Sequence, residues 1–315
     1  MKAGEKESTL VSFARCFAEY AEKDESFVML AAESEADSEI TSLLPQDKII
    51  FADNSAGSVI LSAAGLAVEG RRPWVMGRAA DLVAAGYAQI REAVALPGLP
   101  VRLVAVNGGL SSAREGASAQ FLEDIALMRS MPEMELFVPA DENDIRCVLE
   151  KSRRRKGPLY LRLSRTPAPL LEGPAGEDFK IGGARILSPG TGVTICACGI
   201  MVSQAVEAAE KLKRQNISAE VIDCCSLKPF PEQLLLSSVR KTGCCVTAEE
   251  HSTIGGLFGA AAECLGRTCP VPMRSVAVAD QFVNSGTPEE LHGYYGLTWQ
   301  EIVDAAAEVW ALRRR

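Results

Sequence analysis

The 315-residue chain is poor in positive charge and in histidine. It has 33 Lys and Arg against 41 Asp and Glu, a net charge of −8. A nucleic-acid backbone needs a basic surface, so this balance argues against a nucleic-acid partner. Only two histidines occur, His251 and His292, and there is no C-x-x-C pair. No metal site is therefore predicted.

Long apolar runs are also missing. None reaches the roughly 18 residues that a membrane-spanning helix needs. The first ten residues, MKAGEKESTL, have no apolar core of the kind that secretion signals carry. We therefore expect a cytoplasmic protein with no membrane contact. Its ten cysteines are then expected to be reduced and to pack as small buried apolar residues.

Strands and helices alternate through the first half of the chain. Short apolar runs predict buried strands at 27–32, 48–52, 74–76, 101–106, 134–139 and 159–163. Apolar residues at helical spacing between them predict helices that include 8–23, 79–94 and 141–150. This order predicts an α/β fold with a doubly wound parallel sheet in a domain at 1–165.

The second half predicts a smaller domain of the same class. Residues 166–190 are rich in proline, glycine and charge and are interpreted as a linker. Residues 191–315 again alternate strands with helices and are interpreted as a second α/β domain. Two helices rich in glycine and alanine, at 56–68 and 254–265, are thin enough for another backbone to approach closely. We interpret them as subunit or domain contacts.

Several segments resemble the transketolase family and the related deoxyxylulose phosphate synthases. TAEEHSTIGGLFGAAAE at 247–263 and FVNSGTPEELHGYYGLTWQEIV at 282–303 are similar to their C-terminal domain. LSAAGLAVEG at 61–70, YAQIREAVALPGLPVRLVA at 87–105 and ASAQFLEDIALMRSMPEMELFVPADENDI at 117–145 are similar to their pyrimidine-binding domain. The resemblance covers nearly the whole chain, and the length matches the separately encoded C-terminal section of a split transketolase.

This resemblance implies a cofactor and a partner. In the family, thiamine diphosphate lies between two domains, and one of them holds the diphosphate through Mg²⁺ and a G-D-G…N motif. This chain has no such motif, so it would provide only the pyrimidine side of the cofactor site. The resemblance thus implies a separate N-terminal transketolase-like subunit, a heterotetramer with a homodimer contact, and two-carbon ketol transfer between sugars.

The positions that carry the family's chemistry hold other residues here. Ala56 stands where the family has the glutamate that hydrogen-bonds the aminopyrimidine. Arg78 and Asp81 stand at the positions of the phenylalanines that stack on the pyrimidine. Asn107 and Ala119 replace two histidines. Because losing a general acid or base usually costs a factor of about 10² to 10⁴ in rate, these replacements put the activity in question.

The resemblance still implies roles for the residues that are present. The candidates are Glu115, Asn107 and Asp53 for catalysis, Ala56, Arg78, Asp81 and Gln89 for the cofactor, and Arg165, Arg114 and Gln120 for the substrate. Asp53 reaches the site only if its loop is rearranged. Arg165 matches an arginine that can hold a substrate phosphate, and a guanidinium suits that group. An acidic residue near Asp37 replaces the serine that usually pairs with it and would repel a phosphate.

Three functions remain open from the sequence. The first is an active split transketolase-like enzyme in which another group or a water replaces the glutamate. The second is a thiamine-independent reaction, such as a dehydration or isomerisation of a sugar-like acid or phosphate, in a remade charged pocket. That pocket would be formed by Arg78, Asp81, Asn107, Arg114, Glu115 and Arg165. The third is a non-catalytic subunit that stabilises a catalytic partner. His251 is interpreted as an interface residue and His292 as a surface residue.

Overall fold

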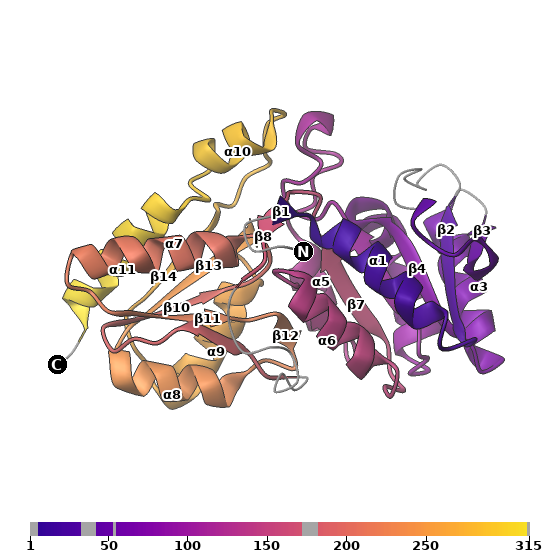
Figure 1. Ribbon diagram of the computed structural model, residues 1–315, viewed down its shortest axis with the longest axis horizontal. Helices are drawn as coiled ribbons and strands as arrows, with labels where there is room; N and C mark the ends of the chain where they lie inside the picture. The colour runs from indigo at the N-terminus through magenta and orange to yellow at the C-terminus, as the bar shows by residue number, and fades with distance from the viewer. Residues whose placement is uncertain (1–5, 33–41, 53–54, 172–181, 314–315) are drawn as a thin grey trace.

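The computed structural model describes residues 6–32, 42–52, 55–171 and 182–313. It contains two α/β units side by side, with the first half of the chain on the right in Figure 1 and the second half on the left. Each unit is built on its own sheet, and both sheets are mostly parallel. The predicted α/β class is confirmed.

The first unit has a seven-stranded sheet with the order β12-β6-β7-β5-β4-β2-β3. Its strands are β2 (Phe27–Ala32), β3 (Ile49–Ala52), β4 (Arg72–Arg78), β5 (Arg102–Val106), β6 (Glu135–Phe137), β7 (Leu159–Leu163) and β12 (Ser226–Lys228). All neighbours pair in parallel except β12, which is antiparallel to β6.

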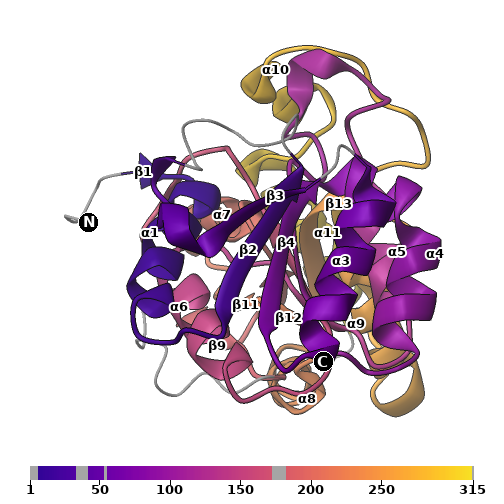
Figure 2. The same cartoon turned by 90° about the vertical axis from the view of Figure 1, so that its right-hand side faces the viewer.

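Helices cover both faces of this sheet (Figure 2). One face carries α1 (Thr9–Ala21) and α6 (Glu142–Ser152). The other carries α3 (Ala56–Val68), α5 (Asp124–Ser130) and a helical stretch made of η2 (Ala80–Ala85), α4 (Tyr87–Gln89) and η3 (Ile90–Ala95). Two short 3₁₀ turns, η1 (Gln46–Lys48) and η4 (Ala113–Glu115), complete the unit. The sheet is thus buried on both sides, as apolar parallel strands require.

The second unit has a five-stranded sheet with the order β14-β13-β10-β11-β9. Its strands are β9 (Arg185–Ser188), β10 (Val193–Ala197), β11 (Ala219–Asp223), β13 (Cys245–Ser252) and β14 (Met273–Val278). Its helices are α7 (Met201–Arg214), α8 (Glu232–Thr242), α9 (Leu257–Thr268), α10 (Pro288–Tyr294) and α11 (Trp299–Leu312). The thin helix predicted at 254–265 therefore begins and ends three residues later.

Some strands do not follow the domain boundaries that the sequence predicted. The predicted linker at 166–190 contains β8 (Ala168–Pro169), which pairs with β1 (Lys6–Glu7), and β9, which is part of the second sheet. Strand β12 lies in the second half of the sequence, but it pairs with β6 at the edge of the first sheet. The domain limits themselves stay predictions.

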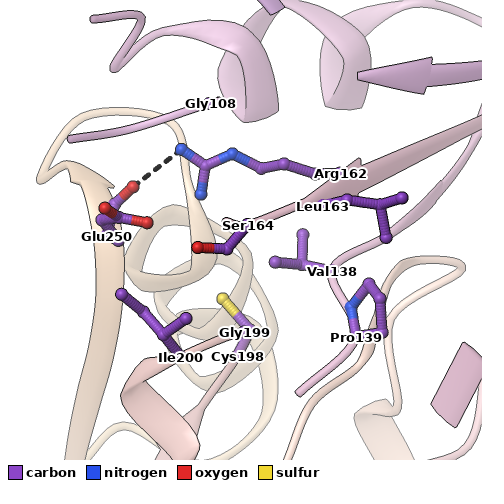
Figure 3. A pocket seen from close by; sticks show the side chains of 10 residues that line it. All are labelled: Gly108, Val138, Pro139, Arg162, Leu163, Ser164, Cys198, Gly199, Ile200 and Glu250. Carbon is purple, nitrogen blue, oxygen red and sulfur yellow. Dashed lines mark hydrogen bonds between the residues drawn. The ribbon is translucent and has the colours of Figure 1, made fainter. Parts of the chain in front are cut away.

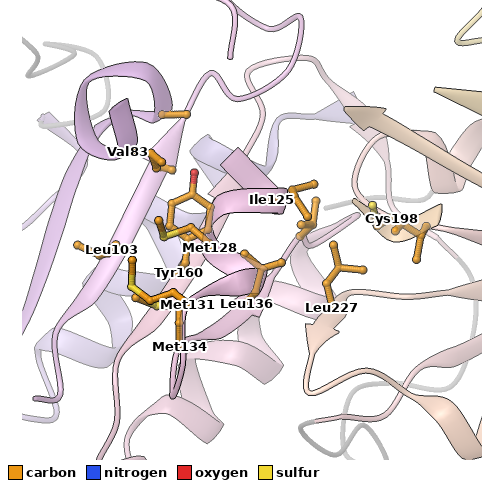
Figure 4. Close-up of a cluster of buried hydrophobic side chains, with 14 of the residues drawn as sticks. Val83, Leu103, Ile125, Met128, Met131, Met134, Leu136, Tyr160, Cys198 and Leu227 are labelled. Atoms are coloured by element: carbon orange, nitrogen blue, oxygen red, sulfur yellow. The ribbon is translucent and has the colours of Figure 1, made fainter. Parts of the chain in front are cut away.

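The apolar core is continuous between the two units. One cluster of buried side chains runs from α3 and α5 of the first unit to β10, β12 and α9 of the second. Figure 4 shows part of it, with Met128 and Tyr160 on one side and Cys198 and Leu227 on the other.

The cysteines are free thiols, and all of them except Cys269 are buried. Their expected packing is confirmed.

Two kinds of feature are absent from the part of the chain that the structure describes. No helix among them is both long and apolar enough to cross a membrane. In the same part of the chain, no group of three or more His, Cys, Asp or Glu side chains is arranged to hold a metal ion.

Candidate functional site

Three predicted site residues come together because they follow neighbouring parallel strands. Arg78 ends β4, Asn107 follows β5, and Arg165 lies two residues beyond β7. The order β4-β5-β7 places the ends of these strands next to one another at one edge of the sheet. Open α/β sheets bind ligands at that carboxyl edge. The position of the candidate site therefore follows from the topology.

Arg78 forms a group of ion pairs with two other candidates. Its Nε lies 2.5 Å from Asp81 Oδ2, and its Nη1 lies 3.0 Å from Glu115 Oε2. The Glu115 side chain is 50% exposed, so the pair contributes little to stability. The pair instead holds the loop at 107–120 close to the end of β4. Glu115, proposed from the sequence for catalysis, faces a guanidinium.

Asn107 holds Arg165. The Arg165 Nε donates to Asn107 Oδ1 at 3.0 Å. Asn107 is buried and has a φ of 60°, in the left-handed region that asparagine tolerates better than most residues. An amide does not exchange protons as a histidine does, so this geometry suits orientation of the arginine rather than acid–base work.

The other two substrate candidates lie apart from this pair. Gln120 is buried, and its Nε2 donates to the carbonyls of Ala113 at 2.8 Å and Asn284 at 3.1 Å. It therefore joins the loop at 107–120 to the segment before α10. Arg114 is exposed on η4.

The start of α3 holds the remaining cofactor candidates. Ala56 is the first residue of the helix and is half-buried. Gln89 packs against the next residue, since a Cβ placed on Gly57 would lie 3.4 Å from Gln89 Cδ and Nε2. The Gln89 Oε1 atom is buried and has no hydrogen-bond partner among the described residues. Asp53 and Asp37 lie outside those residues.

Charged residues also meet where the two units pack together, and the sequence analysis did not predict this contact. The Arg162 Nη2 donates to the backbone carbonyl of Glu250 at 2.8 Å, and its Nε lies 2.9 Å from Asp124 Oδ2. Figure 3 shows Arg162 reaching from β7 toward Glu250 across a small cavity, with Gly108 beside it. The sequence did contain an indication of this contact, namely an arginine inside the apolar run LYLRL. A charged side chain in a buried strand needs a buried partner.

Glu250 also connects α10 to the site loop. Its Oε1 accepts from the backbone N–H of Leu110 at 3.0 Å and lies 3.3 Å from His292 Nε2. Burial lowers the pKa of His292, but the hydrogen bond to Glu250 raises it, and the net pKa is above its usual value. The sequence-based placement of His292 on the surface is wrong, because its side chain is only 17% exposed.

Comparison with known proteins identifies the family. The transketolase pyrimidine-binding domain matches residues 6–169, and the transketolase C-terminal domain matches residues 182–302. The chain belongs to the transketolase family. The family resemblance found in the sequence is thereby confirmed, and members of this family generally depend on thiamine diphosphate.

Two relatives match this chain over nearly their whole length. The 6-deoxy-6-sulfo-D-fructose transketolase subunit SqwH of Clostridium sp. (strain MSTE9) is 40% identical over 293 residues, which cover 92% of this chain and 91% of that protein. A putative transketolase C-terminal section of Methanocaldococcus jannaschii (strain ATCC 43067 / DSM 2661 / JAL-1 / JCM 10045 / NBRC 100440) is 33% identical over 92% of both chains. This chain is therefore a transketolase-like C-terminal subunit of the split type.

Solved structures agree in fold. A split-gene transketolase, described as an inactive beta4 tetramer, superposes with a TM-score of 0.88 at 36% identity. The match covers 98% of this chain and 100% of that one. Transketolase from Campylobacter jejuni subsp. jejuni NCTC 11168 is 19% identical with a TM-score of 0.83, and this chain covers 47% of its length.

Proposed function

We propose that this chain works with a separate N-terminal subunit as a thiamine diphosphate-dependent transketolase acting on sugar or sugar-like ketoses. The observation that carries the proposal is the match to split transketolase subunits over nearly the whole chain. SqwH, by its name, belongs to an enzyme of this class that acts on a sulfonated sugar.

The residues at α3 fit the pyrimidine half of the cofactor. Gln89 packs on Gly57 in the first turn of α3, and its Oε1 has no hydrogen-bond partner among the described residues. Ala56 leaves room but supplies no proton, so the family's carboxylate has no counterpart at that position. When bound, thiamine diphosphate supplies the carbon nucleophile. The partner subunit would hold Mg²⁺ and the diphosphate.

Arg165 suits the anionic end of a substrate. Asn107 holds its Nε, and a guanidinium oriented in this way binds phosphate or sulfonate oxygens well. Arg114 on η4 adds a second positive charge at the rim of the loop. We propose a ketose that ends in a phosphate or a sulfonate.

A non-catalytic, stabilising subunit is the second candidate function. It is favoured by the absence of the family's glutamate at position 56 and of its histidines at positions 107 and 119. The ion pair of Glu115 with Arg78 agrees with it. In that case the N-terminal subunit would need this chain for stability or assembly and not for chemistry.

The first prediction is that transfer activity depends on the cofactor. The chain co-purified with its N-terminal subunit should transfer two-carbon units from a ketose phosphate or sulfonate to an aldose. Removing thiamine diphosphate and Mg²⁺ should abolish this transfer, and adding them back should restore it. Product formation is followed by mass spectrometry. Each subunit alone should be inactive.

Two results would contradict this function. An activity that persists after complete removal of thiamine diphosphate would favour the remade, thiamine-independent pocket. If no donor gave any transfer, and this chain greatly stabilised the N-terminal subunit, the results would favour the non-catalytic, stabilising subunit.

An exposed apolar surface suggests self-association. Leu61 and Val68 on α3 are 52% and 69% exposed, and Leu96, just after η3, is 73% exposed. Gly65 lies between them on α3 with open space above its Cα. Exposed large apolar side chains that gather on one helix can mark an interface. We propose that a second copy of the chain covers it.

The second prediction tests that interface. Leu61→Glu should weaken self-association at least roughly 30-fold, which corresponds to about 2 kcal/mol, because it places a charge in an apolar contact. The matched control is Leu312→Glu on α11, where the leucine is 56% exposed but lies on the other unit. Sedimentation velocity measures the self-association of both variants. Equal self-association of the two variants would show that this surface is not the contact between copies.

A further inference from the structure

The loop at 107–120 (the site loop) begins in close contact with the second unit. The backbone N–H of Leu110 donates to Glu250 Oε1 at 3.0 Å, and this hydrogen bond is buried. Gly109 has a φ of 70°, and a Cβ on it would lie 2.6 Å from the Glu250 carbonyl oxygen and 2.8 Å from Glu250 Cδ. Glycine is therefore needed for the close approach of β13. Glu250 thus contacts the loop two and three residues beyond Asn107.

The site loop carries polar groups of the candidate site. Asn107, its first residue, accepts from Arg165 Nε at 3.0 Å. Glu115, further along the loop, pairs with Arg78 near the surface. The hydrogen bond to Leu110 fixes the backbone close to Asn107. Because Asn107 in turn orients the guanidinium of Arg165, a residue that holds this part of the loop also sets the position of the arginine.

His292 on α10 contacts the same carboxylate oxygen as the site loop. Its Nε2 lies 3.3 Å from Glu250 Oε1, and the two side chains are only 17% and 5% exposed. A protonated imidazole carries a hydrogen on both nitrogens, so Nε2 then donates to the carboxylate. The added charge strengthens the attraction, and it does so more in a buried site than in water. A protonated His292 therefore holds Glu250 more firmly than a neutral ring does.

The surroundings of His292 favour its protonated form. Burial lowers the pKa of His292, but the hydrogen bond and charge of Glu250 on β13 and the charge of Glu289 on α10 raise it above 6.5. Lys6 on β1 acts in the opposite direction, since it lines the same cavity of about 280 Å³ beside the ring. Arg162 on β7 donates to the backbone of Glu250 (Figure 3). The ring therefore lies beside a cavity and changes its charge near neutral pH.

We propose that Glu250 is a positioning residue for the substrate site and that protonation of His292 regulates its hold on the site loop. This inference rests on the proposed function. The protonated pair holds Leu110 and thereby keeps Asn107 in the orientation that presents Arg165 to the anionic end of the substrate. Because the pKa of His292 is raised, this hold is complete below pH 6.5 and weakens as pH rises through the raised value.

Hydrogen exchange of the full chain tests the hold on the loop without any need for activity. Protection of the Leu110 amide, measured by mass spectrometry relative to the intrinsic exchange rate, should fall roughly fivefold in the wild type from pH 6 to pH 8.5. His292→Gln keeps a neutral donor and does not titrate, so its protection should be equal at both pH values. The matched control is Glu308→Gln, which alters an exposed ion pair with Arg274 on the same unit. It should behave like the wild type.

Steady-state kinetics of the assembled two-subunit complex test the effect on the substrate. The donor is a sulfonated ketose, because the charge of a sulfonate does not change in this pH range. KM should rise roughly fivefold from pH 6 to pH 8.5 in the wild type and stay constant in His292→Gln, whereas kcat should change in parallel in the two proteins. Glu250→Gln keeps an oxygen that can accept from Leu110 but lacks the charge, so it should also lose the pH dependence of KM.

The two measurements separate this inference from the proposed function. A purely structural role for His292 would change the melting temperature of His292→Gln and leave the pH dependence of KM as in the wild type. If exchange at Leu110 depended on pH equally in both proteins, the inference would be wrong whatever the activity. If the complex transferred no two-carbon unit from any donor, the proposed function would fail together with the effect on the substrate. The exchange data would still decide whether Glu250 and His292 hold the loop.

Discussion

Replacing Arg185 with alanine is expected to lower the free energy of unfolding by about 3–5 kcal/mol, because it leaves buried carboxylates without their cation. The Arg185 Nη2 lies 2.6 Å from Asp223, 3.0 Å from Asp144 and 3.1 Å from Asp141. All four side chains are at most 3% exposed. Arg185 and Asp223 lie in the second sheet, whereas Asp141 and Asp144 begin α6 of the first unit.

The cluster has more negative than positive charge, and this makes the arginine essential. Burial raises the pKa of Asp144 and of Asp223, and mutual repulsion among the carboxylates adds to that rise. The guanidinium opposes both effects and joins the two units. Without it, the buried carboxyl groups could avoid mutual repulsion only by taking up protons, so the contact between the units should weaken first.

Urea unfolding at pH 7 measures the loss. The matched control is Arg267→Ala, which breaks an exposed ion pair with Glu232 whose two side chains are 68% and 47% exposed, and it should change stability little. Adding Asp144→Asn to Arg185→Ala should restore part of the loss, because it removes one buried carboxylate. If Arg185→Ala unfolded at the same urea concentration as Arg267→Ala, the cluster would have no stabilising role.

Local patterns were sufficient to predict most of the fold. The strand predicted at 27–32 is β2, and the helix predicted at 56–68 is α3. The helix predicted at 79–94 is instead divided by π-helical segments, because apolar spacing does not distinguish a π turn from an α turn in such a short stretch. Strand β12 was not predicted, since a three-residue segment is a strand only when a distant neighbour such as β6 pairs with it.

The candidate site was only partly predictable. Parallel topology places the residues that follow β4, β5 and β7 at one edge, so the grouping of Arg78, Asn107 and Arg165 follows from strand order. The partner that each side chain takes depends on contacts between distant segments. Arg162 and Glu250 were missed for that reason, since they meet only where the two units pack together.

Glu249→Gln and His251→Gln are expected to change the pH dependence of stability in opposite directions. Both residues lie on β13, with Glu249 Oε2 3.9 Å from His251 Nδ1, and both are fully buried. The His251 Nδ1 donates to the Ser252 carbonyl at 2.8 Å, and its Nε2 accepts from the Ala126 N–H at 3.4 Å. This geometry fits the neutral ring. It also confirms His251 as an interface residue, because Ala126 lies on α5 of the first unit.

Burial moves the two pKa values in opposite directions. It lowers the pKa of His251 from 6.5 to about 4, so the stability of the neutral ring is present above pH 6.5 and is lost as pH falls toward 4. Burial also raises the pKa of Glu249 from 4.5 to about 7, although two backbone N–H groups at the start of α9 oppose that rise. The stability of its protonated form is present below pH 4.5 and is lost as pH rises toward 7.

Between pH 4.5 and 6.5 the two effects offset each other in the wild type, because each amounts to about 1.4 kcal/mol per pH unit. Glu249→Gln leaves the histidine alone, so its stability relative to the wild type should fall as pH decreases through this window. His251→Gln leaves the carboxyl alone, so its relative stability should rise. Urea unfolding at half-unit pH steps gives both slopes, and His292→Gln controls for the other histidine. Parallel curves for the two variants would show that these groups do not titrate as a buried pair.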